Sequence, residues 1–262
     1  MKKLHVLSLP FIVLFLGLLV FTCCLKTTLS SVPDIKSVPN TILLQCNAAL
    51  RITTPEGKVI YVDPWCGKST DYDDLIHEKG FDLPADLILV THSHWDHYQL
   101  NIIEKKNLDC QTILWKDMIT EATEDSAKVV SRTYKTGLDL GFVIVDAIEG
   151  CHAGGASYAL TLSNAKSIYI SGDIDILKGG LSDDVISQLA GYNLDYAFIN
   201  CDGENSIDAA KASDYAARIK PKHIIPYHID HLGAGNLDIK IAEKLQAEGR
   251  VIMNPGETIA IE

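Results

Sequence analysis

The feature that most constrains this chain is the stretch THSHWDHYQL, which begins at Thr91 and directly follows an apolar segment, ADLILV. It places His92, His94, Asp96 and His97 within six residues, although the whole chain has only nine histidines. So many imidazoles pack poorly in a core and are unusual on a surface. They are explained if the fold has to hold a divalent cation, because imidazole and carboxylate suit zinc, iron or manganese.

The apolar segment ADLILV indicates a buried strand that runs straight into the histidines. In an extended chain, residues i and i+2 point to the same side, so His92 and His94 can bind one ion. Asp96 and His97 follow where the chain turns, and they can approach a second ion from another side. The spacing therefore predicts two adjacent metal ions.

Four residues cannot saturate two ions, and three other apolar segments end at potential ligands. GFVIVDAIEG leads to Cys151 and His152, SIYIS leads to Asp173, and HIIPY leads to His228. Sites in α/β sheets gather at the carboxyl ends of strands. We therefore expect a composite site built from distant parts of the chain.

The hydrophobic pattern predicts an α/β sandwich with sheets in the middle and helices outside. Ser182, Asp208 and Asp238 are the expected N-caps of three helices, which end at Gly191, before Pro221 and at Gly249. The expected strands are Thr41–Leu44, Lys58–Val62, Asp86–Val90, Thr112–Trp115, Gly141–Ala147, Ser157–Leu162, Ser167–Ile170, Tyr196–Ile199, His223–Pro226 and Arg250–Met253.

The motif THSHWDH resembles HxHxDH, the signature of the metallo-β-lactamase fold superfamily. The similarity continues through YVDPW, the histidine at position 152, ISGDID and KPKHIIPYH, over roughly residues 41–231. The order and spacing are similar to the branch that contains ascorbate-6-phosphate lactonase and related metal-dependent hydrolases. The resemblance implies a four-layer αβ/βα sandwich of the α/β (α+β) class, with two central mixed sheets and helices outside.

The resemblance also implies a role for each matching residue. Asp63 in YVDPW would orient a ligand histidine by a hydrogen bond, and Asp96 would both bind metal and serve the chemistry. The metal ligands would be His92, His94 and His152 for the first ion, Asp96, His97 and His228 for the second, and Asp173 as the bridge between them.

Several of these positions have alternatives. Asp173 follows a glycine and could be only a turn residue, with Asp175 close by as a competing carboxylate. His228 competes with His223, for which a structural role at a strand start is expected, and with His231, which could contact substrate.

Two ions about 3.5–4 Å apart can share a water whose pKa falls toward about 7, so hydroxide becomes available at neutral pH. The expected reaction of this dinuclear-site hydroxide is hydrolysis of an ester, lactone, amide or phosphodiester. Asp96 is expected to orient the nucleophile or move a proton. Trp95 and Tyr98, which stand within the motif region, are expected to pack beneath the pocket rather than line it. The expected cofactors are two divalent ions, Zn²⁺ first, with Mn²⁺ or Fe²⁺ as alternatives.

Two other classes of function remain open at this stage. Superfamily members that hold di-iron for redox chemistry tend to carry glutamate at the position of His94, and a stretch of 262 residues is not expected to hold a flavin or rubredoxin module as well. A non-catalytic metal-binding or scaffold protein is the other alternative, because a filled metal site can be purely structural.

The first 25 residues predict an export signal or membrane anchor, because Met1-Lys2-Lys3 is followed by an uncharged apolar run, Leu4–Leu25. Cys23 follows a sequence that resembles a bacterial lipobox, so a lipoprotein and an uncleaved anchor are both open; a buried helix is the third alternative. Residues 26–40 are the expected linker and residues 41–262 the hydrolase domain. This organisation places the protein in the bacterial cell envelope, attached to the membrane.

The formal net charge of −11 argues against nucleic acid as a partner. A small-molecule or lipid-like substrate is expected instead, and a sugar-phosphate lactone fits poorly with an exported chain. The oligomeric state is left open. The cysteines lack the spacing of a disulfide framework, so most are expected to be small buried residues.

Overall fold

The computed structural model describes residues 38–65, 80–97, 99, 111–115, 129–132, 137–151, 154–177, 179–204, 206–229 and 238–262. The chain divides into two compact units, Met1–Asp34 and Ile35–Glu262, and every described residue belongs to the second unit. The predicted leader and most of the predicted linker therefore lie outside the described residues. In the described part, no helix combines the length and apolar character needed to cross a bilayer.

The first sheet of the described structure is mixed and has seven strands in the order β13-β1-β2-β3-β4-β5-β6. Its β13, β1, β2 and β3 are antiparallel neighbours, whereas β3, β4, β5 and β6 run parallel. The strands are β1 (Thr41–Cys46), β2 (Ala49–Thr53), β3 (Val59–Val62), β4 (Leu87–Leu89), β5 (Gln111–Trp115), β6 (Val129–Arg132) and β13 (Thr258–Ala260).

The second sheet is also mixed and has six strands among the described residues, in the order β12-β11-β10-β9-β8-β7. Its β10, β11 and β12 run parallel, and β7, β8, β9 and β10 are antiparallel neighbours. The strands are β7 (Leu138–Asp139), β8 (Val143–Ile148), β9 (Ser157–Leu162), β10 (Ser167–Ile170), β11 (Tyr196–Asn200) and β12 (His223–Tyr227).

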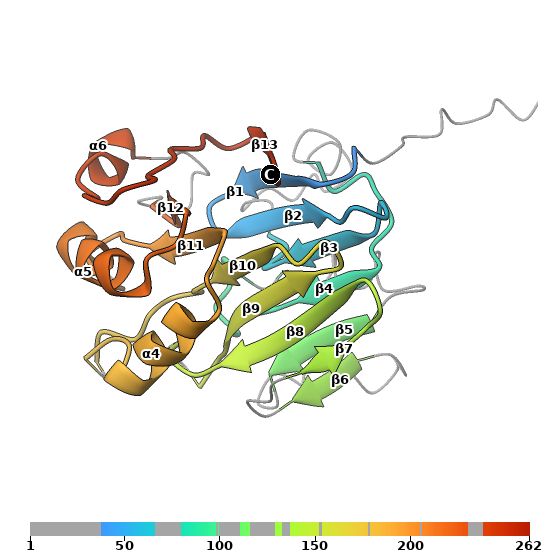
Figure 1. Ribbon diagram of the computed structural model, residues 1–262, viewed down its shortest axis with the longest axis horizontal. Helices are drawn as coiled ribbons and strands as arrows, with labels where there is room; N and C mark the ends of the chain where they lie inside the picture. The colour runs from blue at the N-terminus through green and yellow to red at the C-terminus, as the bar shows by residue number, and fades with distance from the viewer. Residues whose placement is uncertain are drawn as a thin grey trace, which may run out of the picture. The chain divides into compact units, whose positions relative to one another are not determined.

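Alternating side chains of the second sheet divide between two hydrophobic cores. On β11, Tyr196 and Phe198 belong to a core shared with the first sheet, whereas Ala197 and Ile199 belong to a core shared with the helices. This alternation follows from the two-residue period of a strand. Figure 1 shows the two sheets as layers, with the helices beside the second one. The predicted sandwich of two mixed sheets is confirmed.

The helices begin at the predicted caps. Helix α4 (Asp183–Gly191) starts after Ser182, whose side chain accepts from the amide of Val185, and α5 (Ala209–Ile219) starts after Asp208 in the same way. Helix α6 (Ile239–Ala242) starts after Asp238, but the prediction that it extends to Gly249 is wrong. Two carbonyls beyond its end, those of Glu243 and Leu245, accept from the Arg250 guanidinium instead of from backbone amides.

Strand prediction failed where the hydrophobic pattern was weak or interrupted. Strand β2 was not predicted because Arg51 interrupts its apolar alternation; this side chain pairs with Asp82 and the carbonyl of Gly80. Strands β6, β7 and β13 were also missed, and all three are short. The segment Arg250–Met253 was predicted as a strand, but it forms only an isolated bridge between Arg250 and Ile224.

Asp195 joins the starts of the three parallel strands in the second sheet. Its Oδ2 accepts from the amide of Ser167 (3.0 Å), and its Oδ1 lies 2.7 Å from Nζ of Lys222 and 3.4 Å from Nζ of Lys166. Burial by itself would raise the pKa of this carboxyl group. The hydrogen bonds and the two ammonium charges outweigh burial and hold its pKa below the usual value.

Candidate metal centre

The predicted ligands come together where strands of both sheets end. His92 and His94 follow β4 in the first sheet, whereas Asp173 follows β10 and His228 follows β12 in the second. Two groups have ligand atoms that all lie within 4.8 Å of one another: His92, His94 and Asp173 form the first group, and Asp96, His97 and His228 form the second. The resemblance implied His92 and His94 for one ion and Asp96, His97 and His228 for the other; its third ligand for the first ion, His152, lies outside the described residues.

Asp173 lies between the two groups and directs one oxygen to each. Its Oδ2 is 3.7 Å from Nε2 of His92, in the first group. Its Oδ1 is 3.3 Å from Nε2 of His97 and 3.5 Å from Nε2 of His228, in the second group. Asp173 is therefore close to histidines of both groups, so its side chain does more than belong to a turn.

The four described histidines of the site are crowded. The ring centroid of His92 is 4.6 Å from that of His94 and 4.1 Å from that of His97, and the rings of His97 and His228 stack at 4.7 Å. Within the described part of the chain, the buried Nε2 atom of His97 makes no hydrogen bond. Buried polar atoms are almost always satisfied. Metal ions bound by the two groups would satisfy this nitrogen, so the donor set fits the cofactor that the fold implies.

Asp63 and Thr91 determine which ring nitrogens carry protons. Asp63 accepts from the amide (2.7 Å) and hydroxyl (2.7 Å) of Thr91, and its Oδ2 is 2.8 Å from Nδ1 of His97. Because the Thr91 hydroxyl donates to Asp63, it can only accept from Nδ1 of His92, 3.0 Å away. Both rings therefore carry hydrogen on Nδ1, which leaves the Nε2 lone pairs for a metal.

Asp63 reaches this position because the chain turns sharply after β3. Its backbone adopts a left-handed φ of 46°, and its amide still donates to the carbonyl of Leu89 on neighbouring β4. Strand β3 thus delivers a carboxylate beneath the histidines of β4. The contact between Asp63 and His97 is the one that the resemblance implied for this residue.

The charges of the site favour bound cations. Burial alone would raise the pKa of Asp173, but His228 and His97 hold its pKa well below the usual value. Burial would lower the pKa of His97, yet Asp173 and Asp63 raise it well above the ordinary value, and His228 shifts in the same direction because of Asp173 and Asp96. Several buried carboxylates around one point attract positive charge, whether it comes as protons or as metal ions.

Asp96 is the most accessible carboxylate of the site, and 18% of its side chain is exposed. Its Oδ2 is 3.2 Å from Nε2 of His228. Burial would raise the pKa of Asp96, but the hydrogen bond from His228 and the charges of His97 and His228 lower it below the usual value. Asp96 is therefore a carboxylate at neutral pH and within reach of water.

The two described alternatives, Asp175 and His223, belong to neither ligand group. Asp175 is buried and accepts from the amide of Leu177. His223 stacks on the ring of Tyr196 at 5.0 Å, as expected for a structural histidine. His152, His231 and Tyr98 lie outside the described residues, so their predicted roles remain predictions.

The expectation for Trp95 is wrong. Its side chain is 53% exposed, so it does not pack beneath the pocket. The indole instead meets the buried ring of Trp65 edge-on, with 5.5 Å between centroids. Trp65, which follows Asp63 closely in sequence, is the buried member of this pair.

The described cysteines are buried and free, as predicted. They are Cys46, Cys151 and Cys201. Cys151 lies beside the first ligand group, with Sγ 3.6 Å from Nδ1 of His92. Burial raises the pKa of its thiol well above the usual value, so this residue is a neutral thiol in the metal-free protein.

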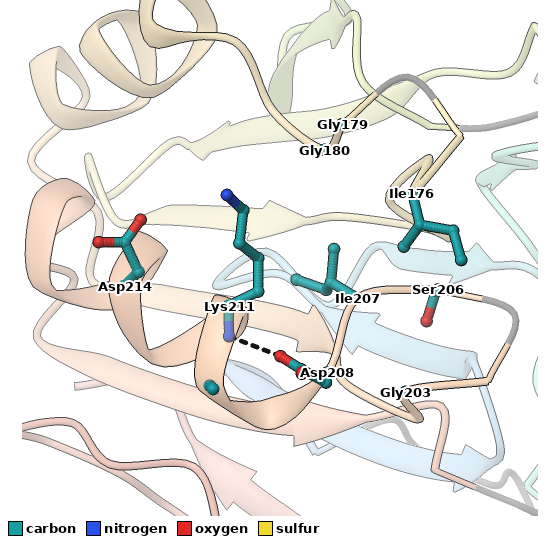
Figure 2. A pocket seen from close by; sticks show the side chains of 10 residues that line it. Ile176, Gly179, Gly180, Gly203, Ser206, Ile207, Asp208, Lys211 and Asp214 are labelled. Carbon is teal, nitrogen blue, oxygen red and sulfur yellow. Dashed lines mark hydrogen bonds between the residues drawn. The ribbon is translucent and has the colours of Figure 1, made fainter.

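A separate cavity of about 620 Å³ lies at the start of α5. Figure 2 shows its wall, where Ile207 and Lys211 project and the amide of Lys211 donates to Asp208. The segment that follows Asp173 contributes Ile176 to the lining. Among the described lining residues there is no member of either ligand group, so this cavity is not the metal centre itself.

Thr91 and Asn47 are the residues of the site that sequence reasoning missed. Thr91 stands at the head of the quoted motif, so its position was known but its hydroxyl was not assigned a role. Asn47 donates from Nδ2 to Oδ2 of Asp96 at 3.3 Å. No local signal marks Asn47, because the contact joins residues that are far apart in the chain.

Comparison with known proteins identifies the family of the chain. A family model described as a beta-lactamase superfamily domain matches residues 45–228. A UPF0173 metal-dependent hydrolase of Polynucleobacter asymbioticus is 30% identical in an alignment of 248 residues that covers 81% of this chain and 83% of that protein. A second one, from Thermodesulfovibrio yellowstonii, is 25% identical over 252 residues, covering 82% of this chain and 90% of the relative.

Solved structures share the fold. Igni18, a metallo hydrolase from the archaeon Ignicoccus hospitalis, superposes with a TM-score of 0.68 at 18% identity, covering 85% of this chain and 98% of that one. The metallo-beta-lactamase fold protein YhfI of Bacillus subtilis gives a TM-score of 0.61 at 12% identity, covering 84% and 97%.

The fold and the paired His/Asp groups define a metal-dependent hydrolase of the metallo-beta-lactamase superfamily. Within that superfamily, the chain belongs to the UPF0173 metal-dependent hydrolase family.

Proposed function

We propose that the protein hydrolyses its substrate with two divalent metal ions, one in each ligand group. The observation that carries this proposal is the position of Asp173, which directs Oδ2 to the first group and Oδ1 to the second. Zn²⁺ is the proposed ion for both positions, because imidazole nitrogens dominate the donor set. From the resemblance, His152 completes the first group.

When bound, the two ions would lower the pKa of a water and polarise the group under attack. The chain supplies orientation and proton transfer. Asp63 and Thr91 hold His97 and His92 by their Nδ1 atoms, so the Nε2 atoms would be available to the ions. Asp96, a carboxylate that water can reach, would orient the nucleophile or accept its proton.

The proposed substrates contain an ester, lactone, amide or phosphodiester bond. Neighbours in fold include a protein described as an isothiocyanate hydrolase and another described as a diphosphatase. These neighbours support testing both carbon and phosphorus centres, because one fold can host many chemistries. A sugar-phosphate lactone belongs in the panel because of the resemblance to the lactonase branch.

The test combines metal analysis with turnover. Zinc-loaded protein is assayed with p-nitrophenyl acetate, a homoserine lactone, a sugar-phosphate lactone and bis(p-nitrophenyl) phosphate, before and after dialysis against a chelator. We expect two ions per chain, turnover of at least one substrate, loss of activity on chelation and recovery with Zn²⁺. Tight zinc without turnover of any substrate would favour a scaffold protein, and bound iron with visible colour would favour redox chemistry. Full activity after exhaustive chelation would rule out the proposed mechanism.

We also propose that the apolar segment Leu4–Leu25 attaches the protein to the bacterial envelope, where a lipid-like substrate is accessible. The support is the basic start and the uncharged run of the sequence. Fractionation of cells that express the full chain tests this location. Recovery of the protein in the membrane fraction, and its release when residues 1–25 are deleted, are the expected results; a full chain that stays in the cytosolic fraction contradicts the proposal. Cys23→Ala distinguishes a lipoprotein from an uncleaved anchor.

A further inference from the structure

Asn47 occupies the tight connection between β1 and β2, at the edge of the first sheet where the metal ligands gather. Its side chain is buried, with 6% of the residue exposed. Its backbone is left-handed, with a φ of 43°. Asparagine tolerates this conformation better than other residues with a side chain, apart from aspartate. The conformation turns Asn47 inward instead of toward solvent, where most turn residues point.

Two contacts join Asn47 to the second ligand group. Its Nδ2 donates to Oδ2 of Asp96 at 3.3 Å, and its carbonyl accepts from the backbone amide of His228 at 3.1 Å. Asp96 follows β4 in the first sheet, whereas His228 follows β12 in the second. A single residue therefore connects ligands that the two sheets deliver separately.

Backbone strain gathers around this group. Asn47, Asp63 and His228 are three of the seven non-glycine residues with positive φ in the described structure. Left-handed backbone in such residues costs free energy and persists where the surrounding contacts demand it. The strain in Asn47 and His228 occurs at the two ends of the hydrogen bond that joins them.

The amide of Asn47 has one favourable orientation. Exchange of its oxygen and nitrogen would place Oδ1 against the Asp96 carboxylate, where two acceptors repel. In the observed orientation, Oδ1 is buried and has no hydrogen-bond partner among the described residues. A buried carbonyl without a donor is unfavourable. The structure therefore keeps the hydrogen bond from Nδ2 to Asp96 although Oδ1 has no donor among the described residues.

We propose that Asn47 is a positioning residue for the second metal ion. It holds Oδ2 of Asp96 and Nε2 of His228 at the observed separation of 3.2 Å, through its side chain on one side and its carbonyl on the other. This inference rests on the proposed function, since it requires an ion in the second group. Asn47 acts through the two ligands, in the way that outer partners generally orient metal ligands.

The test compares Asn47→Gly with the unaltered protein. Glycine adopts the left-handed φ and keeps the backbone carbonyl, so the substitution removes only the side-chain donor. Asn193→Gly is the matched control: Asn193 is also left-handed, with a φ of 50°, and its Nδ2 donates to the carbonyl of Gly191 at the end of α4. Zinc is titrated into metal-free protein by calorimetry, and Co²⁺ absorption spectra report the geometry of each site.

We expect Asn47→Gly to lower the affinity for the second ion about tenfold, which is the lower end of the range for outer partners of metal ligands. The first ion should keep its affinity within about twofold, and the Co²⁺ spectrum should change only for the second equivalent. Asn193→Gly should match the unaltered protein in both titrations. The melting temperature of the metal-free protein should be similar in all three.

Three results would overturn the inference about Asn47. The first is an unchanged affinity for the second ion in Asn47→Gly. The second is an equal loss of affinity for both ions. The third is a loss of affinity in Asn193→Gly as large as in Asn47→Gly. Failure of the proposed function has a different signature, since the unaltered protein would then bind fewer than two ions or turn over nothing.

Discussion

Substitution of Asp63 by asparagine tests how the buried carboxylate controls the histidines. Asp63 is fully buried and faces three donors: the amide and hydroxyl of Thr91 and Nδ1 of His97. An asparagine amide has one oxygen and one NH₂ group, so it cannot accept from all three. If NH₂ faces His97, the imidazole proton must move to Nε2, the nitrogen proposed to bind metal. If the oxygen faces His97, NH₂ opposes the Thr91 amide.

The expected loss of zinc affinity follows from the hydrogen bonds of Asp63 that the substitution removes. A hydrogen bond to a charged group contributes about 1.5–3 kcal/mol, and at least one such bond disappears. Loss of an outer partner typically weakens metal binding about 10–100-fold, which corresponds to about 1.4–2.8 kcal/mol. The two ranges overlap. We therefore expect Asp63→Asn to lower the affinity for zinc about 10–100-fold. The larger effect is expected for the ion in the group that contains His97.

The assay is competition for zinc with a chromophoric chelator, followed by thermal unfolding of the metal-free and zinc-loaded proteins. Asp146→Asn is the matched control, because Asp146 is a buried carboxylate in β8 that accepts from Gly137 and from the hydroxyl of Tyr192 at 2.7 Å. The control should lose stability and keep its zinc affinity. If Asp63→Asn binds zinc within about threefold of the unaltered protein, the argument for orientation by Asp63 is refuted.

Three further substitutions test other parts of the structure. Gly155→Ala should destabilise the protein by about 1–3 kcal/mol in chemical denaturation, because the new Cβ would lie 2.2 Å from the carbonyl of Thr91. Tyr227→Phe leaves the buried amide of Gly172 without its acceptor, which should cost about 1–3 kcal/mol and lower kcat by shifting the adjacent carboxylate of Asp173. Asp195→Asn should lower stability at pH 7, but the deficit should shrink below about pH 4, because the depressed pKa of the native carboxyl contributes stability that is lost as pH falls through that pKa.

Controls separate these effects from general damage. Gly191→Ala introduces a Cβ with nothing within 4 Å, so its stability should not fall. Tyr61→Phe loses a buried hydrogen bond to the carbonyl of Leu83, and it should lose stability while keeping kcat. Unchanged stability in Gly155→Ala would contradict the close packing against Thr91. A kcat loss in Tyr61→Phe as large as in Tyr227→Phe would contradict the role of Tyr227. A constant deficit of Asp195→Asn from pH 7 to pH 3 would contradict the sign of its pKa shift.

Much of the fold followed from local patterns in the sequence. Buried strands such as β10 and β11 have apolar side chains on both faces, since one face packs on the other sheet and one on the helices. The caps at Ser182 and Asp208 are local signals, and both were predicted correctly. Prediction failed for β2 and for Arg250–Met253. In both segments an arginine, Arg51 or Arg250, contacts backbone outside the segment, and the hydrophobic pattern does not indicate such contacts.

The site divides in the same way. The sequence alone determined that His92 and His94 share one side of an extended chain and that Asp96 and His97 follow a turn, because the two-residue period of a strand is a local property. Strand ends in the sequence also indicated Asp173 and His228 as candidate ligands. The resemblance to a known family added Asp63 and assigned Asp173 and His228 their places, which depend on which strands are neighbours.

Only the tertiary structure decided how Asp63, Thr91 and Asn47 control the ligands. Asp63 reaches His97 because β3 lies beside β4, and Asn47 meets His228 because the edges of two different sheets come together. Such contacts depend on strand order, register and left-handed backbone at single residues. Side chains that are distant in the sequence have no periodic relation to one another, so only the folded arrangement of the strands shows that they meet.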